Sequence, residues 1–133
     1  MLFDDVTAAT LVSALRGYEA RNLAISNNLA NAETPGYQRL DVSFEETLAE
    51  ASREAHGVRG GGMGGGSRAE AASLLENFVP QATAEPGAMR ADGGSVDPDT
   101  EMAALAQNQL AHQTVTSLLD KHLTLIRTAI IGR

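Results

Sequence analysis

Large apolar residues recur over the first thirty positions at alternating steps of four and three. This spacing puts them on one side of an α-helix and is typical of a coiled-coil seam. We therefore expect a helix from about residue 5 to residue 31. One seam member is polar, Asn22, which either fixes register as a buried residue or faces water. The members are Leu11, Leu15, Tyr18, Asn22, Ile25 and Leu29.

The last third of the chain carries the strongest helix signal. Asp97 suits an N-cap, Pro98 fits the first helical position, and Gly132 follows the last periodic residue. We expect a helix up to about Ile131, with Glu101 near the positive end of its dipole. Its seam comprises Met102, Leu105, Gln109, His112, Thr116, Leu119, Leu123, Ile126 and Ile130.

The apolar surface of this last helix is wider than one partner helix can cover. Leu118, Leu125 and Val115 extend the seam sideways, so the polar residues form only a narrow arc. At ~1.5 Å per residue the first helix spans roughly 40 Å and the last roughly 50 Å, which suits an antiparallel pair. Such a pair leaves part of the last helix uncovered, and we therefore expect self-association or co-assembly.

The residues after the first helix predict a turn, a short extended segment and a weak helix. Asn31 suits a helix C-cap, and Pro35 followed by Gly36 is the combination that a type II turn requires. Apolar and polar residues alternate over 40–44, which indicates an extended segment. Residues 45–55 look weakly helical, with Leu48 their only large apolar residue.

Residues 56–95 differ in kind from the flanking segments. A glycine-rich run at 60–66 has maximal backbone freedom, and the only apolar cluster lies at 74–79. Ordering costs about 1–2 kcal/mol of backbone entropy per residue, so we expect this segment to be mobile. The predicted fold is mostly α: two long terminal helices in an antiparallel, coiled-coil-like pair, a short extended segment and a flexible glycine-rich middle. Its four parts are 1–34, 35–55, 56–95 and 96–133.

Composition removes several classes of function. The formal net charge of −7 argues against binding a phosphate backbone. No apolar run approaches the ~20 residues of a membrane span. The first residues lack the pattern of a cleaved secretory signal, so we expect any export to use another route. Cysteine and tryptophan are absent, and only 4% of residues are aromatic, which favours aliphatic packing in an elongated helical protein.

The segment Asn27-Asn28-Leu29-Ala30-Asn31-Ala32-Glu33-Thr34-Pro35-Gly36-Tyr37 resembles the Asn-Asn-Leu-Ala-Asn-x-x-Thr-x-Gly-Tyr signature of flagellar axial proteins, the rod, hook and hook-associated subunits. Towards the other end, 96–103 together with Asn108-Gln109-Leu110, His112-Gln113 and Leu118-Leu119 resembles the FlgB-type proximal rod proteins. That family tends to have Tyr where this chain has His112. Rod proteins of the FlgC type are the nearest alternative. The resemblance covers about two thirds of the chain.

The resemblance implies a structural subunit that is exported by the flagellar type III apparatus without a cleaved signal. It implies assembly in the rod that crosses the periplasm, next to other rod proteins and the membrane-embedded ring. The terminal helices would form an inner coiled-coil layer around the export channel. The assembly motif carried over comprises Asn27, Asn28, Leu29, Asn31, Thr34, Pro35, Gly36 and Tyr37. This motif either directs the following strand to a neighbouring subunit or only caps its own helix.

No motif in the sequence predicts a reaction or a cofactor. The glycine run lacks the Lys-Ser/Thr of a phosphate-binding loop. His112 and His122 are ten residues apart, which is not the i, i+4 spacing of a helical metal pair, and we expect both to be packing residues. A soluble helical adaptor or export chaperone that binds a partner helix remains the alternative from another functional class.

Overall fold

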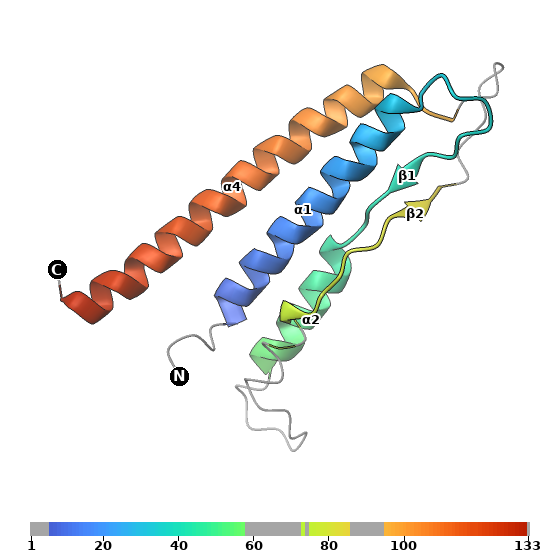
Figure 1. Ribbon diagram of the computed structural model, residues 1–133. Helices are drawn as coiled ribbons and strands as arrows, with labels where there is room; N and C mark the ends of the chain where they lie inside the picture. The colour runs from blue at the N-terminus through green and yellow to red at the C-terminus, as the bar shows by residue number, and fades with distance from the viewer. Residues whose placement is uncertain (1–5, 58–72, 74, 86–94, 133) are drawn as a thin grey trace.

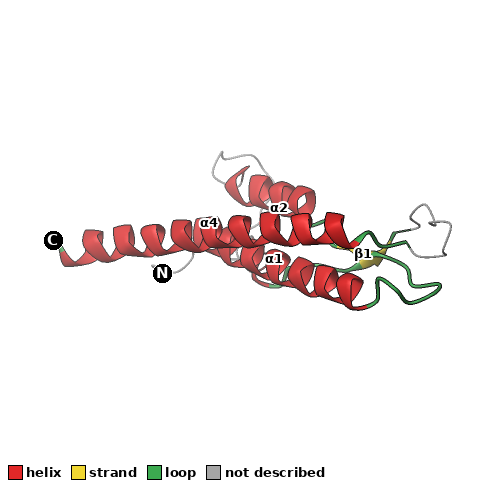
Figure 2. Cartoon of the chain, turned by 90° about the horizontal axis from the view of Figure 1, so that it is seen from above, coloured by secondary structure: helices red, strands yellow, loops and turns green. Residues whose placement is uncertain are grey.

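The computed structural model describes residues 6–57, 73, 75–85 and 95–132. Two long helices dominate it: α1 (Val6–Ala30) and α4 (Pro98–Ile131). They lie side by side and run in opposite directions (Figure 1). Seen from above, the chain is elongated, and α4 accounts for most of its length (Figure 2). The prediction of two long terminal helices that pack together is confirmed; the coiled-coil character of the pair remains a prediction.

Local signals set the ends of α4 as expected. Asp97 is the N-cap, and its side chain accepts a hydrogen bond from the Asp99 N–H at 3.3 Å. Gly132 has φ 72°, and its N–H donates to the Thr128 carbonyl at 2.9 Å, which closes the helix in the left-handed conformation that glycine tolerates.

A type II turn follows α1, as predicted. The Tyr37 N–H donates to the Thr34 carbonyl at 3.2 Å, and Gly36 has φ 76°. The chain then runs back along α1 through strand β1 (Leu40–Asp41) to helix α2 (Glu45–Gly57). The predicted extended segment and second helix are therefore both present.

Strand β2 (Thr83–Ala84) pairs with β1 in an antiparallel register, with Leu40 opposite Ala84 and Asp41 opposite Thr83. Leu75, 0% exposed, lies in the core, and its carbonyl accepts a hydrogen bond from the Ser13 hydroxyl. Residues 75–85, which belong to the segment expected to be mobile, therefore pack against α1 and pair with β1. The sequence analysis weighed only the apolar residues within this segment against its backbone entropy, and it missed the contacts that the segment makes with α1 and β1. The glycine run and the rest of the predicted mobile segment, 58–72, 74 and 86–94, lie outside the described residues.

The core lies between α1 and the segment that returns along it. Phe44 packs edge-on against Tyr18 with ring centroids 5.0 Å apart. Because the Phe44 ring also lies directly on Gly17, the two segments approach closely at this point. The buried apolar residues of this cluster are Val6, Ala24, Val42, Phe44, Leu48 and Leu75. Helix α1 is thus the central element, in contact with α4 on one side and with β1 and α2 on another.

Candidate assembly site

The predicted assembly motif lies at the end of the molecule where α1 ends and α4 begins (Figure 1). Its members divide into two groups. Asn28 is buried, while Leu29, Asn31 and Tyr37 are half-buried. Asn27, Thr34, Pro35 and Gly36 are exposed. The motif therefore presents a turn to solvent and sends one asparagine into the interior.

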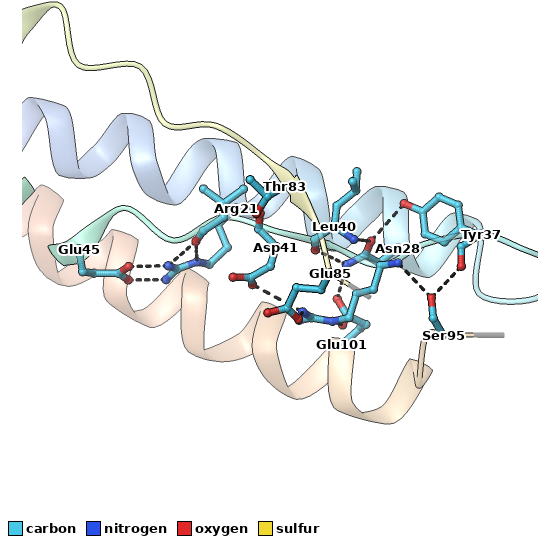
Figure 3. A network of polar contacts seen from close by, with 12 residues as sticks. Arg21, Asn28, Tyr37, Leu40, Asp41, Glu45, Thr83, Glu85, Ser95 and Glu101 are labelled. Atoms are coloured by element: carbon cyan, nitrogen blue, oxygen red, sulfur yellow. Dashed lines mark hydrogen bonds and ion pairs between the residues drawn. The ribbon is translucent and has the colours of Figure 1, made fainter. Parts of the chain in front are cut away.

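All four hydrogen-bonding positions of the Asn28 side chain are occupied (Figure 3). Its Oδ1 accepts from the Leu40 N–H at 2.8 Å and from the Tyr37 hydroxyl at 3.1 Å. Its Nδ2 donates to the Leu40 carbonyl at 2.8 Å and to Oε2 of Glu101 at 3.0 Å. The Asn28 side chain thus binds both the N–H and the carbonyl of Leu40, as the backbone of an adjacent strand would. It does so on the edge of β1 that faces away from β2.

Glu101 is the buried acid of this end, 1% exposed in the first turn of α4. Its Oε1 accepts from Nε of Arg39 at 2.6 Å, and its Oε2 accepts from Asn28. A buried carboxylate needs such partners on both oxygens to offset its lost hydration. The expectation that Glu101 serves the helix dipole thus missed its main contacts, which are made with Arg39 and Asn28.

Arg39 connects this carboxylate to the hairpin. Its Nη1 donates to Glu85 at 2.9 Å and lies 3.6 Å from Asp41. Burial works to lower the pKa of Arg39, but the hydrogen bond to Glu101 and the surrounding carboxylates outweigh it and raise the pKa above its ordinary value. The guanidinium therefore stays charged across the whole physiological range.

Ser95, just before α4, is hydrogen-bonded to the segment that follows the turn, at Tyr37 and Arg39. The Ser95 hydroxyl donates to the Tyr37 carbonyl at 2.7 Å and accepts from the Arg39 N–H at 3.0 Å. Burial, with the charge of Glu101 as a smaller cause, raises the pKa of Tyr37. Its hydroxyl thus remains a donor to Asn28.

A second polar contact, between Arg21 and Glu45, joins α1 to the start of α2. Two nitrogens of Arg21 donate to the two carboxylate oxygens of Glu45 at 2.6 and 2.7 Å. The same guanidinium donates to the Val42 carbonyl and lies 4.8 Å from the centre of the Phe44 ring. The hydrogen bond to Arg21 holds the pKa of Glu45 below its ordinary value, and the hydrogen bond to Glu45 raises the pKa of Arg21.

The alignment of α1 with α4 has a second fixed point in Asn108. This side chain is buried and donates from Nδ2 to the Tyr18 carbonyl at 2.9 Å, while its Oδ1 has no partner in the part of the chain that the structure describes. Twelve residues separate Tyr18 from Val6, and twelve residues beyond Asn108 the chain reaches Asp120. The end of α4 from about Lys121 therefore projects past the first described turn of α1, as Figure 1 shows. We call 121–131 the overhang.

The predicted packing seam is divided by this geometry. Ile25 is buried, and most other seam residues are half-buried: Leu11, Leu15, Tyr18, Leu105, Leu119 and Ile126. Leu123 and Ile130, which lie in the overhang, are 48% and 63% exposed. Met102, Gln109 and Thr116, which hold the same heptad position beside α1, are exposed as well, so this line of predicted seam residues is uncovered along the whole of α4. Asn22, the polar seam member, is half-buried and accepts a hydrogen bond from the Ser26 hydroxyl.

The outer surface of the helix pair carries many exposed apolar side chains. They lie along the whole of α4, with one on α1: Leu23, Met102, Leu110, Leu118, Leu123, Leu125, Ile130 and Ile131. Isolated exposed leucines are normal on a soluble protein, but a series of this length along one helix is typical of an interaction surface.

The described residues contain no group of three or more His, Asp or Glu side chains that could hold a metal ion. Within the same residues, no helix has the length and hydropathy needed to cross a membrane. His112 and His122 are half-buried on the α1-facing side of α4. One pocket is open to solvent, and none of the side chains that line it is titratable; they are Ser43, Thr47, Phe78, Val79, Pro80, Gln81 and Thr83.

Three residues of this site were missed from the sequence: Arg39, Ser95 and the buried role of Glu101. Their partners lie 56 to 73 positions away along the chain. No local pattern predicts contacts over such distances. The one usable signal was the position of Arg39 directly before the alternating segment 40–44, where a charged side chain that becomes buried needs a partner.

Comparison with known proteins identifies similar chains. A family profile described as "Flagella basal body rod protein" matches residues 10–38, which contain the whole assembly motif. The chain is 32% identical over 119 residues to flagellar basal body rod protein FlgB of Cereibacter sphaeroides (strain ATCC 17029 / ATH 2.4.9), covering 86% of this chain and 85% of the relative. It is 26% identical over 126 residues to the FlgB protein of Bacillus subtilis (strain 168), covering 95% and 94%. With the FlgB protein of Escherichia coli (strain K12) it shares 31% identity over 103 residues, covering 75% of each chain.

Proposed function

We infer the role of this chain from its family: it belongs to the FlgB family of flagellar basal body rod proteins, since it is 32% identical to a member over 86% of its length. It is therefore a structural subunit of the flagellar rod. Relatives from several bacteria that match over most of the chain are FlgB proteins, so the FlgB type is favoured over the FlgC type.

The exposed apolar surface of α4 supports a specific physical role. We propose that this surface packs against other subunits of the rod, including copies of this chain, because each exposed leucine or isoleucine there stabilises an assembly by roughly 1.5–3 kcal/mol when it is fully buried. The long terminal helices would then line the axial channel. The exposed apolar side chains of the overhang, among them Leu123 and Ile130, support this proposal most directly.

We also propose the setting that the resemblance implies. The subunit is made in the cytoplasm, leaves by the flagellar type III apparatus, and assembles in the periplasmic rod between the membrane-embedded ring and the more distal rod proteins. The exposed turn of the assembly motif, Thr34 to Gly36, is a second contact surface for a neighbouring subunit. Its distance along α1 from the overhang is consistent with contacts at both ends of the subunit.

Leu123→Asp tests the role of the overhang. Because Leu123 is exposed in the single chain, the variant should fold with unchanged stability, reach the periplasm, and fail to enter the rod. Thr124→Asp, which adds the same charge one residue away on the polar side, is the matched control and should support motility. A motile Leu123→Asp strain would rule out this packing surface. Leu119→Asp should also block incorporation, but Leu119 is half-buried, so loss of chain stability would contribute.

The adaptor alternative draws support from one observation, the packing of α1 on α4 within a single chain. An adaptor should give a defined oligomer whose helicity does not change with concentration. A rod subunit should gain helicity as its concentration rises, because its terminal helices gain cover only on assembly. Circular dichroism over a concentration series separates the two, and high helicity that is independent of concentration would count against the rod role.

A further inference from the structure

The side of α4 that contacts α1 has a nearly repeating pattern. Its buried and half-buried residues follow one another at steps of one, three and four: Ala104, Leu105, Asn108, Ala111, His112, Val115, Leu119, His122 and Ile126. A shift of α4 by seven residues would replace Ala104 with Ala111 and Leu119 with Ile126, although it would also replace Leu105 with His112 and Val115 with His122. Apolar packing therefore distinguishes poorly between alignments that differ by two helical turns.

Glu101 breaks this repetition. It is the buried acid on this side of α4, and its two oxygens are bound by residues from two other segments, Arg39 and Asn28. A seven-residue shift would bring Asn108 to its place. Arg39 would then lose the carboxylate that it binds at 2.6 Å, and the partly buried guanidinium would have no charged partner on α4.

We propose that Asn28, Arg39 and Glu101 form a register clamp, which commits α4 to one alignment along α1. Asn28 fixes β1 to α1 through both backbone bonds of Leu40. Arg39, next to Leu40, and Asn28 together then hold Glu101 (Figure 3). The three segments are thus tied at one point, which sets the alignment of the helix pair together with the contact between Asn108 and the Tyr18 carbonyl. Selection of register is the best-established use of buried polar residues in helix pairs. This inference goes beyond the proposed function and does not depend on it.

Disulfide trapping measures the alignment directly, because the chain has no cysteine of its own. From the contact between Tyr18 and Asn108, three residues back along α1 lead to Leu15 and three residues on along α4 lead to Ala111. A cysteine at position 15 is therefore combined with a second cysteine at one of three positions. The pair 15–111 reports the native alignment, and the pairs 15–104 and 15–118 report shifts of seven residues in the two directions. In the otherwise native chain at low concentration, the 15–111 pair should oxidise at least about tenfold faster than the other two, because only this pair lies level across the two helices in the native alignment.

In the Glu101→Leu background we expect this preference to fall below about threefold, because the shifted alignments no longer cost the clamp its contacts. Arg39→Leu/Glu101→Leu, which removes the buried carboxylate together with its guanidinium partner, is the second variant should Glu101→Leu not fold. Glu101→Gln keeps an acceptor oxygen for Arg39 and should restore the native preference. Val42→Ala is the control for stability: it removes buried volume next to α1 without touching the clamp, and the 15–111 pair should remain dominant.

Two outcomes would overturn the proposal. One is an unchanged 15–111 preference in a folded variant that lacks Glu101. The other is an equal loss of preference in Val42→Ala, since the alignment would then follow overall stability and not these three residues. Circular dichroism of each variant establishes that it is folded, and non-reducing electrophoresis separates the intramolecular product from dimers.

Discussion

Phe44 and Gly17 make the closest contact in the core. A Cβ atom on Gly17 would lie 2.4–2.6 Å from three atoms of the Phe44 ring. Phe44 is buried against Tyr18 and Arg21 and has little freedom to move away. Glycine is therefore required in the middle of α1, although it weakens a helix by about 0.8–1 kcal/mol relative to alanine.

Gly17→Ala should consequently destabilise the chain. Overpacking costs typically about 1–3 kcal/mol, which exceeds the gain of about 1 kcal/mol in helix propensity. Urea unfolding followed by circular dichroism measures the change. Adding Phe44→Leu to Gly17→Ala should restore part of the lost unfolding free energy, because the smaller leucine side chain relieves the clash. A Gly17→Ala chain as stable as the native one would contradict the contact.

Gly36 has a different requirement, since its φ of 76° is unfavourable for a β-branched residue while a Cβ atom there would meet nothing within 4 Å. Gly36→Val should cost about 1–2 kcal/mol from backbone conformation alone. Gly36→Asn should cost clearly less, because asparagine tolerates the left-handed region. Equal losses of unfolding free energy in the two variants would mean that volume, and not φ, sets the cost.

The α1 residues show what hydrophobic spacing can and cannot predict. The spacing identified large residues of α1 that are buried or half-buried, with Ile25 the buried one among them. It missed a line of small or polar buried residues on the neighbouring side: Ser13, Gly17, Ala24 and Asn28. Small residues carry no apolar signal, yet they are what allows β1 and Phe44 to approach the helix backbone.

At the scale of elements, the Arg21–Glu45 pair gives α1 and α2 a pH-dependent contact. Arg21 holds the pKa of Glu45 below its ordinary value of 4.5. A group with a lowered folded-state pKa stabilises the fold above its unfolded-state value, and the contribution is lost as the pH falls through the folded-state value. The Glu45 side chain is 52% exposed, so the contribution is at most about 1 kcal/mol.

Urea midpoints measured from about pH 6 to about pH 3 test this contact. The native chain should lose more stability than Glu45→Gln over the acid part of this range, since the variant has no charge to lose. The other carboxylates contribute equally to both chains and cancel in the comparison. Parallel curves would show that the pair does not affect stability.

The elements differ in how far they could be predicted. The ends of α4 depend on Asp97, Pro98 and Gly132, which act within one turn, and the sequence located them correctly. Strand β2 has two residues and no periodicity, and it exists because Arg39 and Asp41 lie opposite it. Leu75 was noted only as part of a weak apolar cluster, because its burial depends on contacts with α1 some 60 residues away.

For the whole molecule, the exposed leucines of α4 predict association in solution. Sedimentation of the native chain should show its average mass rising with concentration. Leu118→Asp/Leu125→Asp should remain monomeric to higher concentration, because two exposed apolar side chains are replaced by charges. Gln113→Asp/Thr124→Asp adds the same charge on exposed polar positions and is the matched control. Equal association of the two variants would place the contact surface elsewhere.

The overhang lies far from the residues that set its position. Glu101 is bound in the first turn of α4, while Ile130 lies 29 residues further along, roughly 44 Å away at ~1.5 Å per residue. Because one continuous helix joins the two, the contacts of Glu101 at the start of α4 determine where the overhang lies. Adding or removing two whole turns after Asn108 would lengthen or shorten the distance from Glu101 to the end of α4 by about 10 Å and leave the contacts of Glu101 unchanged. The length by which α4 extends beyond α1 can thus vary by whole helical turns, independently of the contacts that hold the fold together.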